Sequence, residues 1–459
     1  MPAIVTKDFR VHNARQFSES FSESADTYYL GIGRPQAFAN DQAFNDGTDT
    51  SPPTPVDSVG SVEYYVYDDI LSAKKVTSSD ISLVIPRRNW TTGTVYDYYR
   101  HDYGEINSAG NTITTDSGAS TLLDATFYVM NSTFDVYKVI DNNGGAASTT
   151  EPTGNKTTSV FSTADSYKWK YMYSLTASEQ ANFMSTDFIH VSTNASDIST
   201  TAGAIEHVKV TAGGSGGSNG TYTGVAIRGD GSSGECTVVV SSNAVSSVTI
   251  TTAGSGYTYA SVKASDIGNV SGADIDFIIS PPGGHGSDAI AELGGFFVMM
   301  NVDFTQGDGS GDFNTTNDFR RIVLLRNPTD STTGSTATAS TLDGTKSMTF
   351  SGTPGSFQAD EKITQATSGA VGFVVDFNST TKVLRYIQPQ FTNQGVDSDG
   401  NLTAFSSTNT VTGATSSATG TPSSHDTTPE LTADTGDILY IENRKPITRA
   451  SDQTENVKL

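Results

Sequence analysis

Two long blocks of the sequence, residues 203–286 and 331–430, are rich in Gly, Ser and Thr and poor in Lys and Arg. The first block has three Lys or Arg residues and the second has four, whereas the last 29 residues alone have four. This composition disfavours helices and favours short strands joined by turns. Because the entropy of closing a loop rises only slowly with its length, a surface loop tolerates such insertions. We therefore predict a host domain interrupted by two inserted β-modules.

The expected fold is mainly β, in the α+β class with few short helices, and the host domain is expected to be β-sandwich-like. The chain is 35% hydrophobic and 17% charged, both below the usual values for globular domains. After the second block, the stretch DILYIENR predicts the last strand of the host domain. The predicted boundaries are 1–202, 287–330 and 431–459 for the host domain, and 203–286 and 331–430 for the two modules.

Both blocks carry strand patterns of their own. The first contains an approximate repeat, VKVTAGGSGGSNGTYTGVAI from Val208 and VTITTAGSGYTYASV from Val248, which predicts a small β-module with paired halves. In the second, apolar residues alternate between Val371 and Phe377 ahead of NSTTK, which predicts a hairpin turn. Its low-complexity flank, 406–430, is predicted to be loop or linker.

Residues 1–202 have the patterns of ordinary secondary structure. A helix is predicted around Phe9 and Phe21, because apolar residues recur there at roughly helical spacing. A second helix is predicted to begin at Asp57 or Ser58, either of which can cap it, and to end near Lys75.

Four stretches of the same region predict strands. They are 26–38, a strand that ends at Pro86, a hairpin within 126–145, and YKWKYMYSL at 167–175. The strict alternation in the last of these predicts one buried and one solvated face. The face predicted to be buried comprises Tyr167, Trp169, Tyr171 and Tyr173, and the opposite face comprises Lys168 and Lys170.

Charge and cysteine content exclude several classes of protein. Fifty acidic and 27 basic residues give a net charge of −23, which disfavours binding to a nucleic acid backbone or an anionic membrane surface. No apolar stretch approaches the ~20 residues that span a bilayer, so neither a nucleic acid nor membrane insertion is expected. Cys236 is the only cysteine, which excludes an intrachain disulfide and a cysteine zinc site. The first residues do not have the pattern of a secretory signal.

No motif for catalysis stands out, so we expect no catalytic residue, no metal and no cofactor. GGSGG around Ser215 matches a nucleophile elbow, but no helical pattern follows it. The six histidines are scattered, without metal-ligand spacing. The stretches 307–313 and 397–401 resemble calcium loops but have no bidentate Glu at their end, and a polar turn is the simpler interpretation. A hydrolase would need a carboxylate pair or a nucleophile with its base, and the sequence singles out neither.

Six stretches in order carry a resemblance to a known family. They resemble the baseplate wedge protein of T-even-type contractile-tailed phages, the gene-eight product. The resemblance covers roughly 1–200, 287–330 and 431–459. The two blocks resemble the Gly- and Thr-rich β-modules of tail proteins of phages of marine cyanobacteria. The stretches are AIVTKDFR (3–10), PPTPVDSV (52–59), LVIPRRNW (83–90), YKWKYMYSL (167–175), DFRRIVLLRNP (318–328) and YIENRKPITRASDQTE (440–455).

The resemblance implies a structural subunit of the virion's tail baseplate, made and assembled in the host bacterial cytoplasm. It implies a homodimer that bridges neighbouring wedge proteins and takes part in baseplate assembly and rearrangement, without enzymatic activity. The alternative is an exposed tail protein that binds host-surface glycans through Tyr222, Tyr257 and Tyr259. The candidate structural or interface residues are Arg87, Arg88, Trp90, Glu442, Asn443, Arg444, Pro446, Asp452 and Gln453.

Overall fold

The computed structural model is mainly β with short helices, which confirms the predicted fold class. The N-terminal helix is confirmed as α1 (Lys7–Ser20), but its buried side is formed by Val11 and Ala14, whereas Phe9 is 53% exposed. The other α-helices among the described residues are α3 (Ala177–Phe183) and α5 (Ala289–Leu293). The structure describes residues 6–38, 47–55, 66–106, 110–154, 156–192, 199–304, 317–389, 395–397, 399, 401–448 and 455–459.

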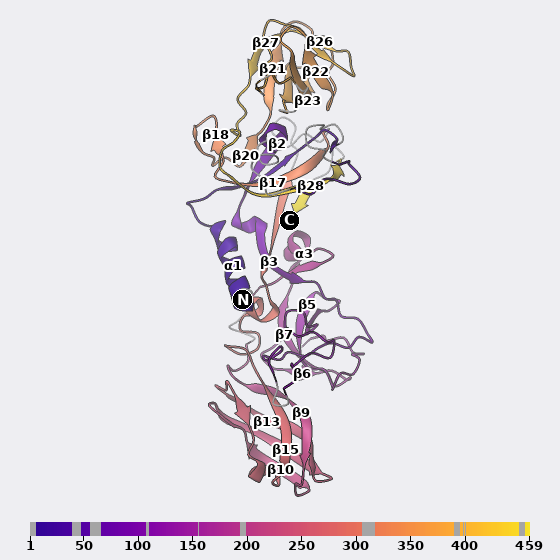
Figure 1. Ribbon diagram of the computed structural model, residues 1–459, viewed down its shortest axis with the longest axis vertical. Helices are drawn as coiled ribbons and strands as arrows, with labels where there is room; N and C mark the ends of the chain where they lie inside the picture. The colour runs from indigo at the N-terminus through magenta and orange to yellow at the C-terminus, as the bar shows by residue number, and fades with distance from the viewer. Residues whose placement is uncertain are drawn as a thin grey trace. The chain divides into compact units, whose positions relative to one another are not determined.

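Two compact units divide the chain (Figure 1). Unit 1 consists of Met1–Ser18 and Ser82–Met299, and unit 2 of Glu19–Ile81 and Met300–Leu459. The first Gly-, Ser- and Thr-rich block lies within unit 1 and the second within unit 2. The finer division into a host domain and two inserted modules stays a prediction.

A four-stranded antiparallel sheet in the order β4-β5-β7-β6 forms the centre of unit 1. Its strands are β4 (Tyr128–Met130), β5 (Asp135–Asp141), β6 (Phe161–Ser162) and β7 (Lys168–Ser174). The pair β4 and β5 confirms the predicted hairpin. In the same unit, β3 (Ile81–Pro86) ends at the predicted proline and pairs with β8 (Phe188–His190).

The prediction of a solvated face on β7 is wrong for Lys170, whereas the side chain of Lys168 is 39% exposed. Lys170 is 0% exposed and Met172 on the same face is also fully buried. An alternating pattern predicts a polar face in water only where nothing packs on that face. Here Lys170 donates to the carbonyl oxygens of Thr157 and Tyr171, and its charge is partly compensated by Glu206 and Glu292, which lie far along the chain.

The first block folds as a β-module with its own core, which includes Ile205, Val238, Tyr257 and Phe277. It contains a three-stranded sheet in the order β10-β12-β13 and a two-stranded ladder of β9 with β15 (Figure 1). The strands are β9 (Ile205–Ser215), β10 (Gly220–Ala226), β11 (Arg228–Gly229), β12 (Ser232–Ser241), β13 (Ala244–Ser255), β14 (Ala260–Ser261) and β15 (Ser271–Ile279).

The two halves of the repeat place a glycine in the same structural role. Gly214 near the end of β9 and Gly254 near the end of β13 have φ of 70° and 65°. A Cβ atom on Gly214 would lie 2.5 Å from the carbonyl oxygen of Ser271, and one on Gly254 would lie 2.7 Å from that of Ser232. Only glycine combines left-handed backbone with so close an approach of a neighbouring strand.

Unit 2 contains a five-stranded sheet in the order β20-β2-β1-β17-β28. The strand DILYIENR is confirmed as part of β28, which pairs antiparallel with β17, but it is not the last strand, because β29 (Glu455–Lys458) follows it. The sheet's strands are β1 (Tyr28–Gly33), β2 (Ile70–Val76), β17 (Phe319–Arg326), β20 (Thr341–Asp343) and β28 (Asp437–Ile447). Shorter pairs are formed by β16 (Phe297–Phe304) with β29 (Glu455–Lys458), and by β18 (Thr329–Asp330) with β19 (Ser335–Thr336).

The second predicted helix is wrong over its C-terminal half, because Ile70–Val76 form strand β2. This strand lies between β1 and β20, and its first four residues are all buried. A strand covered on both faces is a continuous apolar run, which periodicity cannot separate from a buried helix. The first part of the predicted helix, 57–65, lies outside the described residues.

The second block contributes a seven-stranded sheet in the order β26-β25-β22-β23-β24-β21-β27. The hairpin at NSTTK is confirmed by the pairing of β23 with β24. The flank predicted as loop instead contains β25, β26 and β27, because Ser and Thr side chains do not prevent backbone pairing with β21 and β22. The strands are β21 (Lys346–Phe350), β22 (Lys362–Gln365), β23 (Ala370–Asn378), β24 (Val383–Ile387), β25 (Val411–Gly413), β26 (Thr419–Gly420) and β27 (Pro422–Asp426).

Candidate functional site

The described part of the chain contains no group of three or more His, Cys, Asp or Glu residues placed to hold a metal ion. Over the same residues, no helix has the length and apolar character to cross a bilayer. Asp397, in one of the calcium-like stretches, accepts hydrogen bonds from the backbone N–H groups of Asp399 and Asn401, as in a polar turn. The candidate sites are therefore networks of polar and charged side chains.

The IPRRNW segment makes structural contacts within unit 1. Arg87 donates to the carbonyl oxygen of Ser185 at 2.9 Å. Arg88 donates to the carbonyl oxygen of Ala125 and lies 4.7 Å from the ring centroid of Tyr128. Trp90 donates from Nε1 to Ser148 Oγ at 3.1 Å. Both arginines therefore bind carbonyl oxygens of their own unit in these contacts.

The charged C-terminal strip continues the sheet of unit 2. Arg444 pairs with Glu442 on the same strand, with Nε–Oε1 and Nη2–Oε2 distances of 2.5 and 3.0 Å. Pro446 lies near the end of β28 and is exposed. Asp452 and Gln453 lie outside the described residues.

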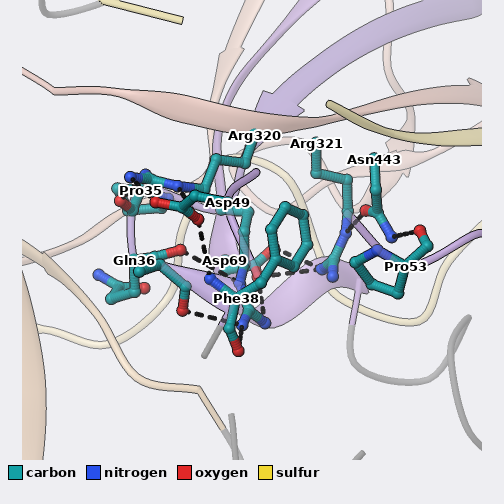
Figure 2. A network of polar contacts seen from close by, with 11 residues as sticks. Pro35, Gln36, Phe38, Asp49, Pro53, Asp69, Arg320, Arg321 and Asn443 are labelled. Carbon is teal, nitrogen blue, oxygen red and sulfur yellow. Dashed lines mark hydrogen bonds and ion pairs between the residues drawn. The ribbon is translucent and has the colours of Figure 1, made fainter. Parts of the chain in front are cut away.

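Asn443, the remaining candidate, belongs to a buried network around Asp69 (Figure 2). Arg321 Nη1 lies 3.0 Å from both carboxylate oxygens of Asp69, and Arg321 Nε donates to Asn443 Oδ1 at 3.1 Å. Asn443 in turn donates to the carbonyl oxygen of Pro53 at 3.1 Å. Arg34, which is 2% exposed, lies 4.0 Å from Asp69. The network joins residues that are distant in sequence but close in the fold.

A second ion pair stands beside this network in Figure 2. Arg320 binds both oxygens of Asp49 at 2.9 and 3.0 Å and donates to the carbonyl oxygen of Pro35. Partial burial raises the pKa of Asp49, but the hydrogen bonds from Arg320 and Phe38 and the charges of Arg320 and Arg34 together outweigh it, so that the pKa lies below its usual value. Asp49 also accepts from the backbone N–H of Phe38. The pair fixes the loop that follows β1 to strand β17.

Unit 1 contains a cluster of charged residues that is almost fully buried, and we refer to it as the charged joint. It comprises Lys138 on β5, Lys170 on β7, Glu206 on β9, Glu292 on α5, and His285, which precedes α5. Lys138 forms an ion pair with Glu292, and the side chains are 0% and 3% exposed. Glu292 also accepts from the backbone N–H of Gly286 at 2.9 Å and of Asp288 at 3.1 Å.

The other half of the charged joint is less completely paired. Glu206 Oε2 lies 3.7 Å from Nε2 of His285, and this oxygen has no hydrogen-bond partner. Burial raises the pKa of Glu206 to about 7, although the two lysines lower it. Burial lowers the pKa of Lys170 to about 8, and that of His285 lies well below its usual value for the same reason. Glu206 therefore titrates near neutral pH.

The charged joint lies where the first β-module meets the rest of unit 1. Close by, His207 of β9 lies 3.3 Å from Asp141, and Asp276 of β15 lies 2.9 Å from Arg100. Ile278 of β15 packs into the main core of unit 1. Both β9 and β15 are thus anchored by polar side-chain contacts as well as by apolar packing.

Replacing Glu206 by Gln should change how stability depends on pH. The folded pKa of Glu206 is raised, so its contribution to stability is greatest below the unfolded value near 4.5 and is lost as pH rises through about 7. The glutamine variant should gain stability relative to the wild type over this interval, by up to about 3 kcal/mol. Urea unfolding at several pH values, followed by tryptophan fluorescence, measures the difference. A difference that stays constant between pH 4.5 and 7.5 would contradict the raised pKa.

Sequence analysis missed the charged joint and the residues Asp69, Arg320 and Arg321. A signal was present, because Lys138 and Lys170 each interrupt an aromatic strand, in DVYKVID and YKWKYMY, and an arginine pair opens the apolar run of β17. Of the three tyrosines in the glycan-binding alternative, Tyr257 is not available at the surface, since it is 2% exposed and its hydroxyl donates to the carbonyl oxygen of Ile227. Tyr259 is 62% exposed.

Comparison with known proteins gives one family. The family model described as Phage-Gp8, Bacteriophage T4, Gp8 matches residues 3–148. The match extends from α1 through β5 and includes the IPRRNW segment. No curated protein matches the chain. The resemblance seen in the sequence is thereby confirmed over 3–148.

Proposed function

From the premise that residues 3–148 match the Gp8 family, we propose that this chain is a structural subunit of the tail baseplate wedge of a contractile-tailed phage. The family match is the observation that carries the proposal. In its finer form, the proposal is a homodimer that bridges neighbouring wedge proteins, is incorporated in the virion and is assembled in the cytoplasm of the host bacterium. The proposal also includes the two Gly- and Thr-rich blocks, as β-modules of the kind found in tail proteins of phages of marine cyanobacteria.

The buried polar networks support a structural role under mechanical force. Asp69 with Arg321 in unit 2, and Lys138 with Glu292 in unit 1, connect segments that are far apart in sequence. Breaking such a pair is costly because it leaves a buried charge without compensation. A subunit held in this way keeps a defined shape when neighbouring proteins exert force on it. The candidate residues Arg87, Arg88 and Trp90 fit this role as internal supports.

Co-assembly tests the proposed function directly. The purified chain, mixed with the other wedge proteins of the same phage, should enter a complex whose mass by light scattering accounts for two copies. The matched control is the same mixture of wedge proteins without this chain. A folded chain that joins no complex at micromolar concentration would mean that the family match marks relatedness of fold without the wedge role.

A further inference from the structure

Strand β28 forms one edge of the five-stranded sheet of unit 2. Within the described residues it pairs with β17 alone, and none of its residues 437–447 is buried. Leu439 and Tyr440 are 41% and 44% exposed. They belong to the run ILYI, four consecutive apolar residues on an edge strand. Such an edge is a template for pairing with another chain.

The hydrogen bond from the backbone N–H of Asn327 to the carbonyl oxygen of Thr27, at 2.8 Å, sets the direction of the backbone groups in β17. Polar groups alternate sides along a strand, so those of Leu324 and Ile322 face β28. These residues lie opposite Tyr440 and Glu442. The N–H and C=O groups of Ile441 therefore point away from β17, towards the open edge.

The ends of this edge carry opposite charges. Asp437 begins β28, where Arg326 Nη2 of β17 lies 2.6 Å from its Oδ2, and its side chain is still 59% exposed. Lys445 lies eight residues further on and is exposed. Pro446 follows it, lacks a backbone N–H and so ends the stretch that can pair. A parallel neighbour of the same sequence would place like charges together, whereas an antiparallel one would place unlike charges together.

We propose that a second copy of this chain pairs with β28 through its own β28, antiparallel and about a twofold axis at Ile441. In this register Ile441 lies opposite its equivalent, and Asp437 of each copy lies opposite Lys445 of the other. The pairing is isologous, because the same surface serves both copies. It joins two five-stranded sheets across the axis and places Leu439 and Tyr440 opposite Asn443 and Glu442 of the other copy. The inference rests on the proposed homodimer and supplies its interface.

Disulfide trapping of the intact chain tests the pairing. Ile441→Cys should give a covalent dimer on mild oxidation, since directly opposite hydrogen-bonded residues have Cα atoms ~5.5 Å apart, within the range that a disulfide spans. Ser335→Cys, on an exposed strand of the same unit, is the matched control and should remain monomeric on a denaturing gel. The native Cys236 is buried in the module core. Equal trapping of both variants, or of neither, would overturn the pairing.

A surface charge reversal gives a second measurement that does not depend on a cysteine. Lys445→Glu places an acidic residue opposite Asp437 at both ends of the interface, and opposed like charges destabilise a strand pair. The dissociation constant of the dimer should rise about tenfold, which corresponds to about 1.4 kcal/mol. Sedimentation at several concentrations measures the constant, and an unchanged value in Lys445→Glu would overturn the register.

The outcomes separate this inference from the proposed function. If the Ile441→Cys variant dimerises in solution but is not trapped by oxidation, the edge pairing is overturned, whereas the homodimer and the wedge role stay intact. If the variant is trapped as a dimer but enters no wedge complex, the interface is supported and the wedge role is contradicted. If the variant is trapped to a different wedge protein in the assembled complex, the second copy is overturned as the occupant of this edge.

Discussion

Glu292→Gln should lower the free energy of unfolding of unit 1 by about 3 kcal/mol or more, because removing one partner of a buried ion pair leaves the other charge uncompensated. Glutamine keeps the shape of the side chain and an oxygen that can accept from the N–H groups of Gly286 and Asp288. The loss therefore reports the missing charge beside Lys138 and Lys170. Urea unfolding followed by tryptophan fluorescence measures it.

The chain offers a specific probe and a matched control for this experiment. Its two tryptophans, Trp90 and Trp169, both belong to unit 1, so their fluorescence reports on that unit. Lys156→Met removes one partner of Asp135 in the same unit. Lys156 is 49% exposed, and Asp135 keeps its hydrogen bonds from Thr133 and Ser174, so the loss should be smaller than that of Glu292→Gln. If Glu292→Gln costs no more than Lys156→Met, Lys138 is not held charged by Glu292.

Adding Lys138→Met to Glu292→Gln should recover part of the loss. Replacing both members of a buried ion pair by groups of similar volume is often neutral. Methionine removes the buried charge and its repulsion towards Lys170. A double variant as unstable as the single one would contradict the assignment of the loss to an uncompensated charge on Lys138.

Local signals predicted the elements that depend on neighbouring residues. Pro86 ends β3, and the stretch DILYIENR predicts β28, because both signals depend on a few neighbouring residues. The role of Lys170 could not be predicted in this way. Its burial depends on Glu206 and Glu292, which come from segments far along the chain, and a sequence pattern carries no record of what packs on a face.

The candidate residues show the same difference between what local sequence predicts and what only tertiary structure reveals. The segment IPRRNW and the strip ENR were recognised by resemblance, and the structure gives their arginines partners within the chain. The partner that organises unit 2, Asp69, stands in the plain sequence YDDI and has no motif around it. Its importance follows only from two arginines, Arg34 and Arg321, that tertiary structure brings to the same carboxylate.

Asp69→Asn should destabilise unit 2 by about 3–5 kcal/mol. Asparagine has the size of aspartate, but it leaves the guanidinium groups of Arg34 and Arg321 buried without this countercharge, with side chains 2% and 10% exposed. Hydrogen exchange of the backbone amides in β1, β2, β17 and β28 measures the loss, since these strands form one sheet. Their protection should fall together.

Two comparisons decide whether the effect belongs to the buried charge at Asp69. Asp49→Asn removes the partner of Arg320 on the same sheet, but Asp49 is 29% exposed, so water replaces part of the lost charge and the loss should be smaller. The tryptophan transition of unit 1 should not move in Asp69→Asn, because both tryptophans lie outside unit 2. Equal losses in the two variants would contradict the larger cost that we assign to the buried charge at Asp69.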